Sequence, residues 1–98
     1  MVCVYVNEGD TWRDRPIHLE ILKLLHREGL SGGTVLRAIA GFTAGGGIHT
    51  TSLVDATGKL PLVVQFVDTE EQVGRVLPKV REMVRDRLIT IENIDVLP

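Results

Sequence analysis

One segment of the chain gathers most of the residue types that could bind a ligand. It runs from Gly41 to Thr50 and contains three consecutive glycines, Gly45 to Gly47, followed by one histidine, His49. Glycine permits positive φ and close approach of a ligand, and consecutive backbone N–H groups in such a loop can form an anion-binding nest. His49 could bind a ligand, change charge near neutral pH or ligate a metal. The segment predicts a small-anion site.

Charged and aromatic residues elsewhere extend this candidate site. Arg37 precedes the glycine-rich segment, and a guanidinium pairs most strongly with phosphate or carboxylate as a bidentate fork. Trp12 and Arg13, in the first loop, could supply a stacking face and a second charge. The candidate ligand-binding residues are therefore Arg37, Gly41, Phe42, Thr43, Gly45, Gly46, Gly47, His49, Arg13 and Trp12.

The same residues also have plain structural explanations. The three glycines could form only a flexible loop, since the chain has neither a Walker lysine nor the Gly-x-Gly-x-x-Gly spacing. Arg37 could make an ion pair between subunits, and His49 could be a hydrogen-bonded residue where the loop returns. Trp12 could be a packing residue. The sequence leaves both sets of explanations open.

Residue patterns typical of catalysis are absent from the sequence. It contains no nucleophile elbow, no paired carboxylates on one element and no cluster of metal ligands. Ser31 and Ser52 have no evident partner base. We therefore expect a protein that is not an enzyme and has no metal centre, with His49 as the one candidate for a metal ligand.

Composition limits the class of protein further. The 98 residues suffice for a single domain, 1–98. A net charge of −2 and the lack of a basic run argue against nucleic acid as a partner. Cys3 is the one cysteine, which excludes an intramolecular disulfide and favours a cytoplasmic protein. No signal peptide or apolar run of membrane-spanning length is present, so we expect no direct membrane insertion.

The hydrophobic pattern predicts six elements in the order β-α-β-β-α-β. Pro16 is expected to open the first helix and Gly29 to end it. Thr69 and Gln72 fit a capping box at the start of the second. The glycine-rich loop covers 43–50, and residues 51–54 could extend a hairpin arm. The predicted strands are 2–7, 34–42, 62–67 and 88–97, and the second helix follows Asp68 or Thr69.

This order predicts an α+β fold, the ferredoxin-like sandwich of one antiparallel sheet with both helices on one face. The first three strands are apolar on both parities, as in Val2-Cys3-Val4-Tyr5-Val6. Strands of this kind are usually buried on both faces. Two helices cover only one face, so the other would be an exposed apolar patch of the kind that marks an interface. We therefore expect a homo-oligomer that packs through its sheets.

The order and spacing of several short motifs resemble PII signal-transduction proteins. Gly41-Phe42, a glycine-rich stretch and then His49-Thr50 look like the base and start of the PII T-loop, and 60–73 resembles the third PII strand with the start of its second helix. The chain resembles, from end to end, the small PII-like family called domain of unknown function 190. The matching pieces are Tyr5 to Trp12, Gly33-Thr34-Val35, Arg37, Gly41-Phe42, Ile48-His49-Thr50 and Leu60-Pro61.

The resemblance implies a ferredoxin-like protomer in a homotrimer, with a ligand pocket between subunits near the base of the loop. It also makes a membrane transporter or channel a candidate partner. The sequence departs from the PII pattern at Thr43, Ala44 and Gly45, where PII proteins have glycine and then basic and glutamine residues. The T-loop tyrosine that PII proteins modify is missing. The segment Arg85-Asp86-Arg87-Leu88 passes straight into the last strand, where PII proteins hold ATP phosphates.

Three functions remain in competition. The first is a PII-like regulatory homotrimer that senses a small anionic ligand, a nucleotide being the first candidate, and signals through the glycine-rich segment. The second is a divalent-metal-binding trimer similar to the CutA proteins, with His49 as the ligand. The third is an adaptor that binds a protein partner and no small molecule.

Overall fold

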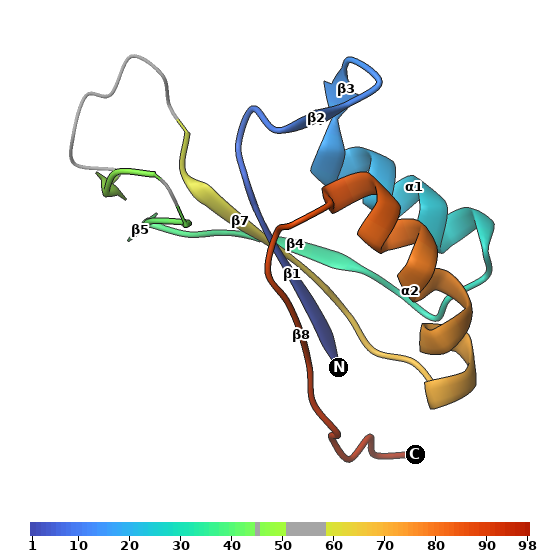
Figure 1. The fold of residues 1–98 in the computed structure, drawn as a ribbon. Coiled ribbons are helices and arrows are strands. Elements are labelled where there is room, and N and C mark those ends of the chain that lie inside the picture. The colour runs from blue at the N-terminus through green and yellow to red at the C-terminus, as the bar shows by residue number, and fades with distance from the viewer. Residues whose placement is uncertain (45, 51–58) are drawn as a thin grey trace.

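The computed structural model describes residues 1–44, 46–50 and 59–98. It confirms an α+β architecture in which two helices accompany an antiparallel sheet (Figure 1). The helices are α1 (Ile17–Arg27) and α2 (Glu70–Val84). The strands are β1 (Val2–Asn7), β2 (Thr11–Trp12), β3 (Arg15–Pro16), β4 (Thr34–Arg37), β5 (Ala40–Gly41), β6 (His49–Thr50), β7 (Pro61–Phe66) and β8 (Ile89–Ile91).

The main sheet has four strands in the order β4-β7-β1-β8, and each neighbouring pair is antiparallel. In the central pair Val4 lies opposite Val64, so alternate residues of β1 and β7 share one face. That face packs against both helices, which lie on the same side of the sheet (Figure 1). Ile21 of α1 and Val80 of α2 are fully buried against it, so the core lies between the sheet and the helix layer.

The first helix begins and ends where the sequence predicts, within one residue. Pro16 occupies the N-cap position and Ile17 is the first helical residue. At the other end Gly29 has a φ of +79°, a conformation that glycine adopts without steric cost. Its N–H donates to the His26 carbonyl at 3.1 Å and the next N–H, of Leu30, to the Leu25 carbonyl at 3.0 Å. This is the hydrogen-bond pattern of a Schellman motif.

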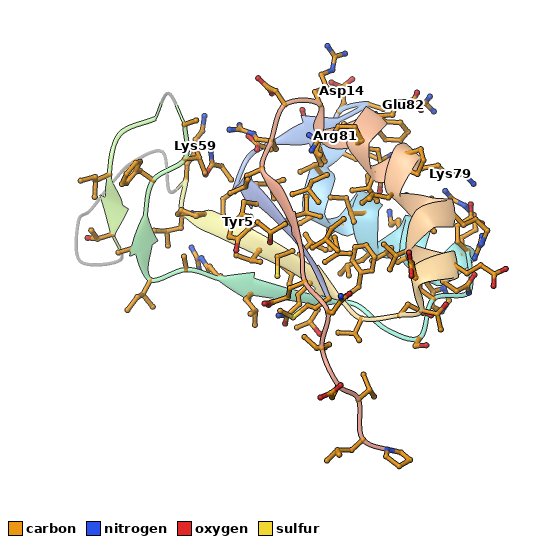
Figure 2. All side chains as sticks on the ribbon, turned by 60° about the horizontal axis from the view of Figure 1, so that its bottom comes forward. Tyr5, Asp14, Lys59, Lys79, Arg81 and Glu82 are labelled. Carbon is orange, nitrogen blue, oxygen red and sulfur yellow. The ribbon has the colours of Figure 1, made fainter. Side chains whose placement is uncertain are left out.

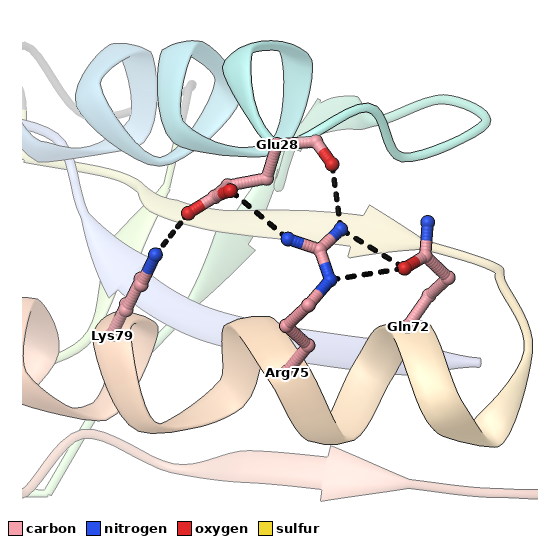
Figure 3. Close-up of polar contacts among 4 residues, drawn as sticks. All are labelled: Glu28, Gln72, Arg75 and Lys79. Carbon is pink, nitrogen blue, oxygen red and sulfur yellow. Dashed lines mark hydrogen bonds and ion pairs between the residues drawn. The ribbon is translucent and has the colours of Figure 1, made fainter.

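The second helix is fixed to the first by one carboxylate. Glu28, at the C-cap of α1, accepts a hydrogen bond from Arg75 Nη1 at 3.0 Å and an ion pair from Lys79 (Figure 3). Arg75 Nη2 also donates to the Glu28 carbonyl at 2.6 Å. The predicted N-cap of α2 is confirmed, since Thr69 Oγ1 accepts from the Gln72 N–H at 3.2 Å. The contacts of Glu28 therefore join the C-terminal end of α1 to the middle of α2.

Two strands are shorter than the sequence predicts. The expected strand 34–42 is divided into β4 and β5, because β7 begins at Pro61, which has no N–H to continue the ladder. Beyond Ala38, whose N–H donates to the Pro61 carbonyl at 2.9 Å, the chain pairs with β6 instead. The expected strand 88–97 contains only β8, because its pairing with β1 ends where Val2 lies opposite Ile91. The predicted hairpin arm at 51–54 lies outside the described residues.

The face of the sheet opposite the helices carries a second set of apolar side chains. Cys3 and Val63 point to this face, and Cys3 is only 8% exposed, whereas Leu36 on β4 is 50% exposed. Phe42 and Leu88, in the loops at the end of the sheet, are 67% and 60% exposed. In the chain by itself these large apolar side chains face solvent.

Over residues 1–44, 46–50 and 59–98, neither helix is long and apolar enough to cross a bilayer.

Candidate functional site

A hollow of about 470 Å³ lies where the base of the glycine-rich segment meets the segment between α2 and β8. We call it the loop-base hollow. It combines two aromatic rings, two side-chain hydroxyls, one guanidinium and one carboxylate. Its lining residues are Tyr5, Phe42, Thr43, Ala44, Pro61, Asp86, Arg87 and Leu88.

The sheet and the end of α2 bring these distant residues together. β1 carries Tyr5 at the centre of the sheet, opposite Val63, which lies two residues after Pro61 in β7 (Figure 2). α2 ends at Val84, and Arg85 adopts a φ of +55°, which reverses the chain direction. The Leu88 carbonyl then accepts a hydrogen bond from the Tyr5 N–H at 3.0 Å, so 86–88 runs beside Tyr5.

A chain of polar contacts through the loop after β1 ties the two sides of the hollow to each other. Arg87 Nη2 lies 3.0 Å from both carboxylate oxygens of Asp10. Asp10 Oδ2 also accepts from the Asn7 N–H at 3.0 Å. The Asn7 side chain in turn donates to Thr43 Oγ1 at 2.7 Å. The base of the glycine-rich segment is therefore held in register with Arg87 through Asn7 and Asp10.

Arg37 does not line this hollow. Its Nη2 lies 3.1 Å from Glu8 Oε1, and the same oxygen accepts from the Leu60 N–H at 3.1 Å. The Arg37 side chain is 61% exposed. The structure thus gives Arg37 an ion pair within its own chain, where the sequence left a ligand contact and an ion pair between subunits open.

The glycine-rich segment is described in part. A Cβ on Gly41 would lie 3.1 Å from Pro61 Cγ, so a larger residue would push β5 away from β7. The Gly46 N–H donates to the Thr43 carbonyl at 2.9 Å and closes a turn. Gly47 is exposed, and the backbone of His49 pairs with Gly41. Gly45 and the His49 imidazole lie outside the described part of the chain.

Trp12 and Arg13 lie at a different place in the fold. They belong to the β2–β3 hairpin, where Arg13 Cζ lies 4.1 Å from the centre of the Trp12 ring. Both residues line a second hollow of about 370 Å³ over the two helices, together with Lys79 and Glu82. Figure 2 shows Glu82 and Asp14, the residue after Arg13, well separated from Lys59 near the glycine-rich segment. One chain therefore does not bring Trp12 and Arg13 together with Phe42 and Thr43.

Comparison with known proteins places the chain in a family. The profile of the family DUF190, described as "Uncharacterized ACR", matches residues 1–96. The chain belongs to the DUF190 family. It is 34% identical to a UPF0166 protein of Methanocaldococcus jannaschii over 88 residues, which are 90% of this chain and 81% of that protein. It is 31% identical to a UPF0166 protein of Aquifex aeolicus over 94 residues, 96% of this chain and 89% of that protein. The predicted family membership is confirmed.

Three lining residues on the far side of the hollow are not among the candidate ligand-binding residues that the sequence predicts. They are Tyr5, Asp86 and Arg87. One signal was present, because Arg85-Asp86-Arg87 places three charges directly after a predicted helix and before a strand. Loops at such junctions are frequent positions for binding residues.

The hollow of this DUF190 protein presents several kinds of side-chain group to solvent. Tyr5 and Phe42 offer ring faces, Tyr5 and Thr43 offer hydroxyls, and Arg87 offers a guanidinium that Asp10 already holds in place. No group of three or more His, Cys, Asp or Glu side chains that could hold a metal ion occurs in the described ranges 1–44, 46–50 and 59–98. Two carboxyl groups that do not line the hollow, those of Glu28 and Asp68, have a lowered pKa. A hydrogen bond from Lys79 lowers the pKa of Glu28, and the Ser31 N–H lowers that of Asp68.

Proposed function

We propose that this DUF190 chain is a PII-like regulatory protein that works as a homotrimer. It binds a small anionic ligand, in the first instance a nucleotide, in clefts between subunits and signals through its glycine-rich segment. The observation that carries this proposal is the loop-base hollow, where Phe42 and Thr43 at the base of that segment meet Arg87. In the PII proteins that the chain resembles, the ligand pocket lies near the base of the T-loop. The loop-base hollow lies at the corresponding place in this sequence.

The architecture supports the proposed assembly. The order β4-β7-β1-β8 with two helices on one face is the arrangement expected of a ferredoxin-like sandwich, the fold that the resemblance implies. On the opposite face Leu36 is half exposed, and Phe42 and Leu88 at its end are more exposed still. Large apolar side chains in a contiguous region favour an interface. A neighbouring subunit laid against this region would close the open side of the hollow.

The lining favours a ligand that is anionic at one end and planar at the other. Arg87 is 30% exposed and is oriented by Asp10, so its position is fixed before a ligand arrives. A fixed guanidinium binds phosphate without the entropic cost of ordering a free side chain. The rings of Tyr5 and Phe42 supply apolar contact for a planar base, and a nucleotide meets both requirements.

The same contacts suggest how binding is reported. Thr43 lines the hollow, receives the Asn7 side chain at 2.7 Å and closes the turn with Gly46 at 2.9 Å. A ligand that displaces or strengthens these bonds changes the start of the glycine-rich segment. Order-to-disorder changes of such a segment are a known type of switch. We propose that the altered segment changes docking to a partner, a membrane transporter or channel being the first candidate.

A ligand screen tests the proposal. The melting temperature of the purified protein is measured with ATP, ADP, AMP and inorganic phosphate, in parallel with light scattering for the mass of the assembly. We expect a trimer and a rise in melting temperature with at least one nucleotide, because a ligand that binds only the folded state stabilises it. The rise should be lost in Arg87→Gln and kept in Arg85→Gln, a matched change two residues away. A stable monomer at micromolar concentration, or no shift with any nucleotide, would refute the proposal.

Two further measurements separate the competing functions. Heat on titration with Cu²⁺ or Zn²⁺ that His49→Ala abolishes would favour a CutA-like trimer. Capture of one protein partner that depends on Ile48, with no response to nucleotide, would favour an adaptor.

A further inference from the structure

An apolar groove lies on the helix side of the sheet, between α2 and the outer edge of β8. We call it the α2–β8 groove. Its volume is about 410 Å³, and it lies apart from both hollows described above. Its lining residues are Gly74, Leu77, Pro78, Arg81, Ile89 and Ile91.

The strand beside the groove has a free edge. β8 is the last strand of the sheet, and no strand within the described residues pairs with its outer side. The inner side bonds to β1 through Leu88 and Glu92, whose carbonyl and N–H are joined to Tyr5 and Met1. Backbone groups alternate in an antiparallel ladder. The N–H and C=O groups of Ile89 and Ile91 therefore point away from the sheet, in position to pair with an added strand.

The floor of the groove carries the two poorest helix formers of α2. Gly74 and Pro78 are one turn apart and both line the groove. Leaving aside its chain neighbours and the backbone of α2, no atom of the described residues lies within 4 Å of a Cβ built on Gly74, so packing against these residues does not require a glycine there. A missing side chain on the outer surface of a helix lets another backbone approach closely. This favours an extended segment as the occupant.

We propose that the groove binds residues 92–98 of a second copy of this chain. That segment carries three exposed apolar side chains, Ile94 at 42%, Val96 at 70% and Leu97 at 88%. An extended segment added to the edge of β8 would gain backbone hydrogen bonds from Ile89 and Ile91 and would bury these side chains against α2.

The segment of the same chain is poorly placed to fill its own groove. The Glu92 N–H donates to the Met1 carbonyl at 2.9 Å, and the Glu92 carbonyl accepts from the N-terminal amine at 2.6 Å. These two bonds continue the line of β8 past its last residue. Residues beyond them extend away from the sheet and from α2, as the red end of the ribbon shows in Figure 2. To reach its own groove the segment would have to reverse direction directly after Glu92.

Charge agrees with this occupant. The segment 92–98 carries two acidic residues, Glu92 and Asp95, and no basic residue. The one charged residue that lines the groove is Arg81. Its Nη1 donates to the Arg87 carbonyl at 2.8 Å, which holds the guanidinium beside the groove. A contact between different surfaces of two copies closes into a ring or continues as a chain. It is compatible with the proposed trimer and does not require a ligand.

Disulfide trapping tests the contact directly. In a background with Cys3→Ser, one preparation carries Val96→Cys and a second carries Pro78→Cys, which puts a thiol in the groove and leaves Gly74 unchanged. The two are mixed under mild oxidation, because a disulfide forms only where two Cα atoms come within about 4.4–6.8 Å. We expect a cross-linked pair of chains, with a yield roughly tenfold above that of a control mixture. The control replaces Pro78→Cys with Glu71→Cys, which puts the same thiol on α2 outside the groove.

A second arm uses the exposed segment itself. Ile94→Asp in the chain that carries Val96→Cys should abolish the cross-link, and since Ile94 is exposed this change leaves the fold intact, as circular dichroism would verify. A yield equal to the Glu71→Cys control, or a yield that Ile94→Asp leaves unchanged, would overturn the proposal. So would a cross-link that forms within single chains carrying both cysteines but not in the mixture. Because neither arm depends on nucleotide, failure here is distinguishable from failure of the proposed function.

Discussion

Replacing Asp10 with alanine is expected to destabilise the protein by about 2 kcal/mol, which is the largest effect we expect from any single polar residue of the candidate site. The side chain of Asp10 is 23% exposed and that of Arg87 is 30% exposed. An exposed ion pair contributes about 0–1 kcal/mol, whereas a hydrogen bond to a charged group contributes about 1.5–3 kcal/mol. The half-buried Asp10 also accepts the Asn7 N–H, so a value within the second range, about 2 kcal/mol, follows.

Urea denaturation at fixed protein concentration measures this change. With a slope of about 1–3 kcal/mol per molar urea, the midpoint should fall by about 1 M, and the melting temperature should fall by about 10 °C. Asp86→Ala, which removes an exposed carboxylate from the same hollow, should change stability by less than about 0.5 kcal/mol. The difference between the two variants isolates the contacts of Asp10 from the general loss of negative charge.

A double-mutant cycle identifies the partner. Arg87→Met retains most of the side-chain volume and removes the charge, so the cycle with Asp10→Ala should give a coupling energy of about 1 kcal/mol or more. A coupling energy near zero would show that Arg87 and Asp10 act independently. In that case Arg87 would not be fixed by Asp10, and the argument that the hollow is prepared for an anion would fail.

Three further outcomes follow from contacts outside the hollow. Because Lys79 lowers the pKa of Glu28, the stability advantage of the wild type over Glu28→Gln should be present above pH 4.5 and should shrink as acid protonates the carboxylate below that value, which thermal melts over a pH series would show. A Cβ on Gly33 would lie 3.0 Å from a leucine side chain of α1, so Gly33→Ala should lower the urea midpoint while Gly47→Ala, in open space, should not. Ile21→Ala should cost roughly 2–5 kcal/mol in urea denaturation, since Ile21 is fully buried between the layers.

Much of the architecture is accessible from the sequence because it depends on local patterns. The period of the apolar residues predicts both helices, and the capping residue Thr69 and the terminating glycine Gly29 act within a few residues of their positions. The strand boundaries are less accessible, since they depend on partners far away in the chain. The strand after residue 88 ends at Ile91 because β1 begins at Val2, a fact that the local sequence of 88–97 does not contain.

Only part of the candidate site could be predicted from the sequence, for the same reason. The sequence predicts Gly41, Phe42 and Thr43 as site residues from their residue types and position. Two of these, Phe42 and Thr43, line the hollow. Arg37 has the guanidinium that an anion site needs, but it forms an ion pair with Glu8 in the loop after β1. The local sequence around Arg37 does not predict this partner. Arg87 becomes part of the site through a chain reversal at Arg85 and a hydrogen bond to Tyr5, neither of which a spacing rule predicts.

The loop after β1 connects these observations. It contributes Glu8 to Arg37 and Asp10 to Arg87, and Asn7, the last residue of β1, contacts Thr43. Such a loop transmits a change from one contact to the others, because its residues share one backbone. If a ligand bound at Arg87 and shifted the guanidinium, the paired Asp10 carboxylate would move with it. The Asn7 N–H would follow the carboxylate, and Thr43 would move with Asn7. We therefore expect Asn7→Ala to leave nucleotide binding nearly unchanged while it uncouples binding from protease protection of the glycine-rich segment. Equal loss of both responses would instead show that Asn7 acts on the ligand site itself.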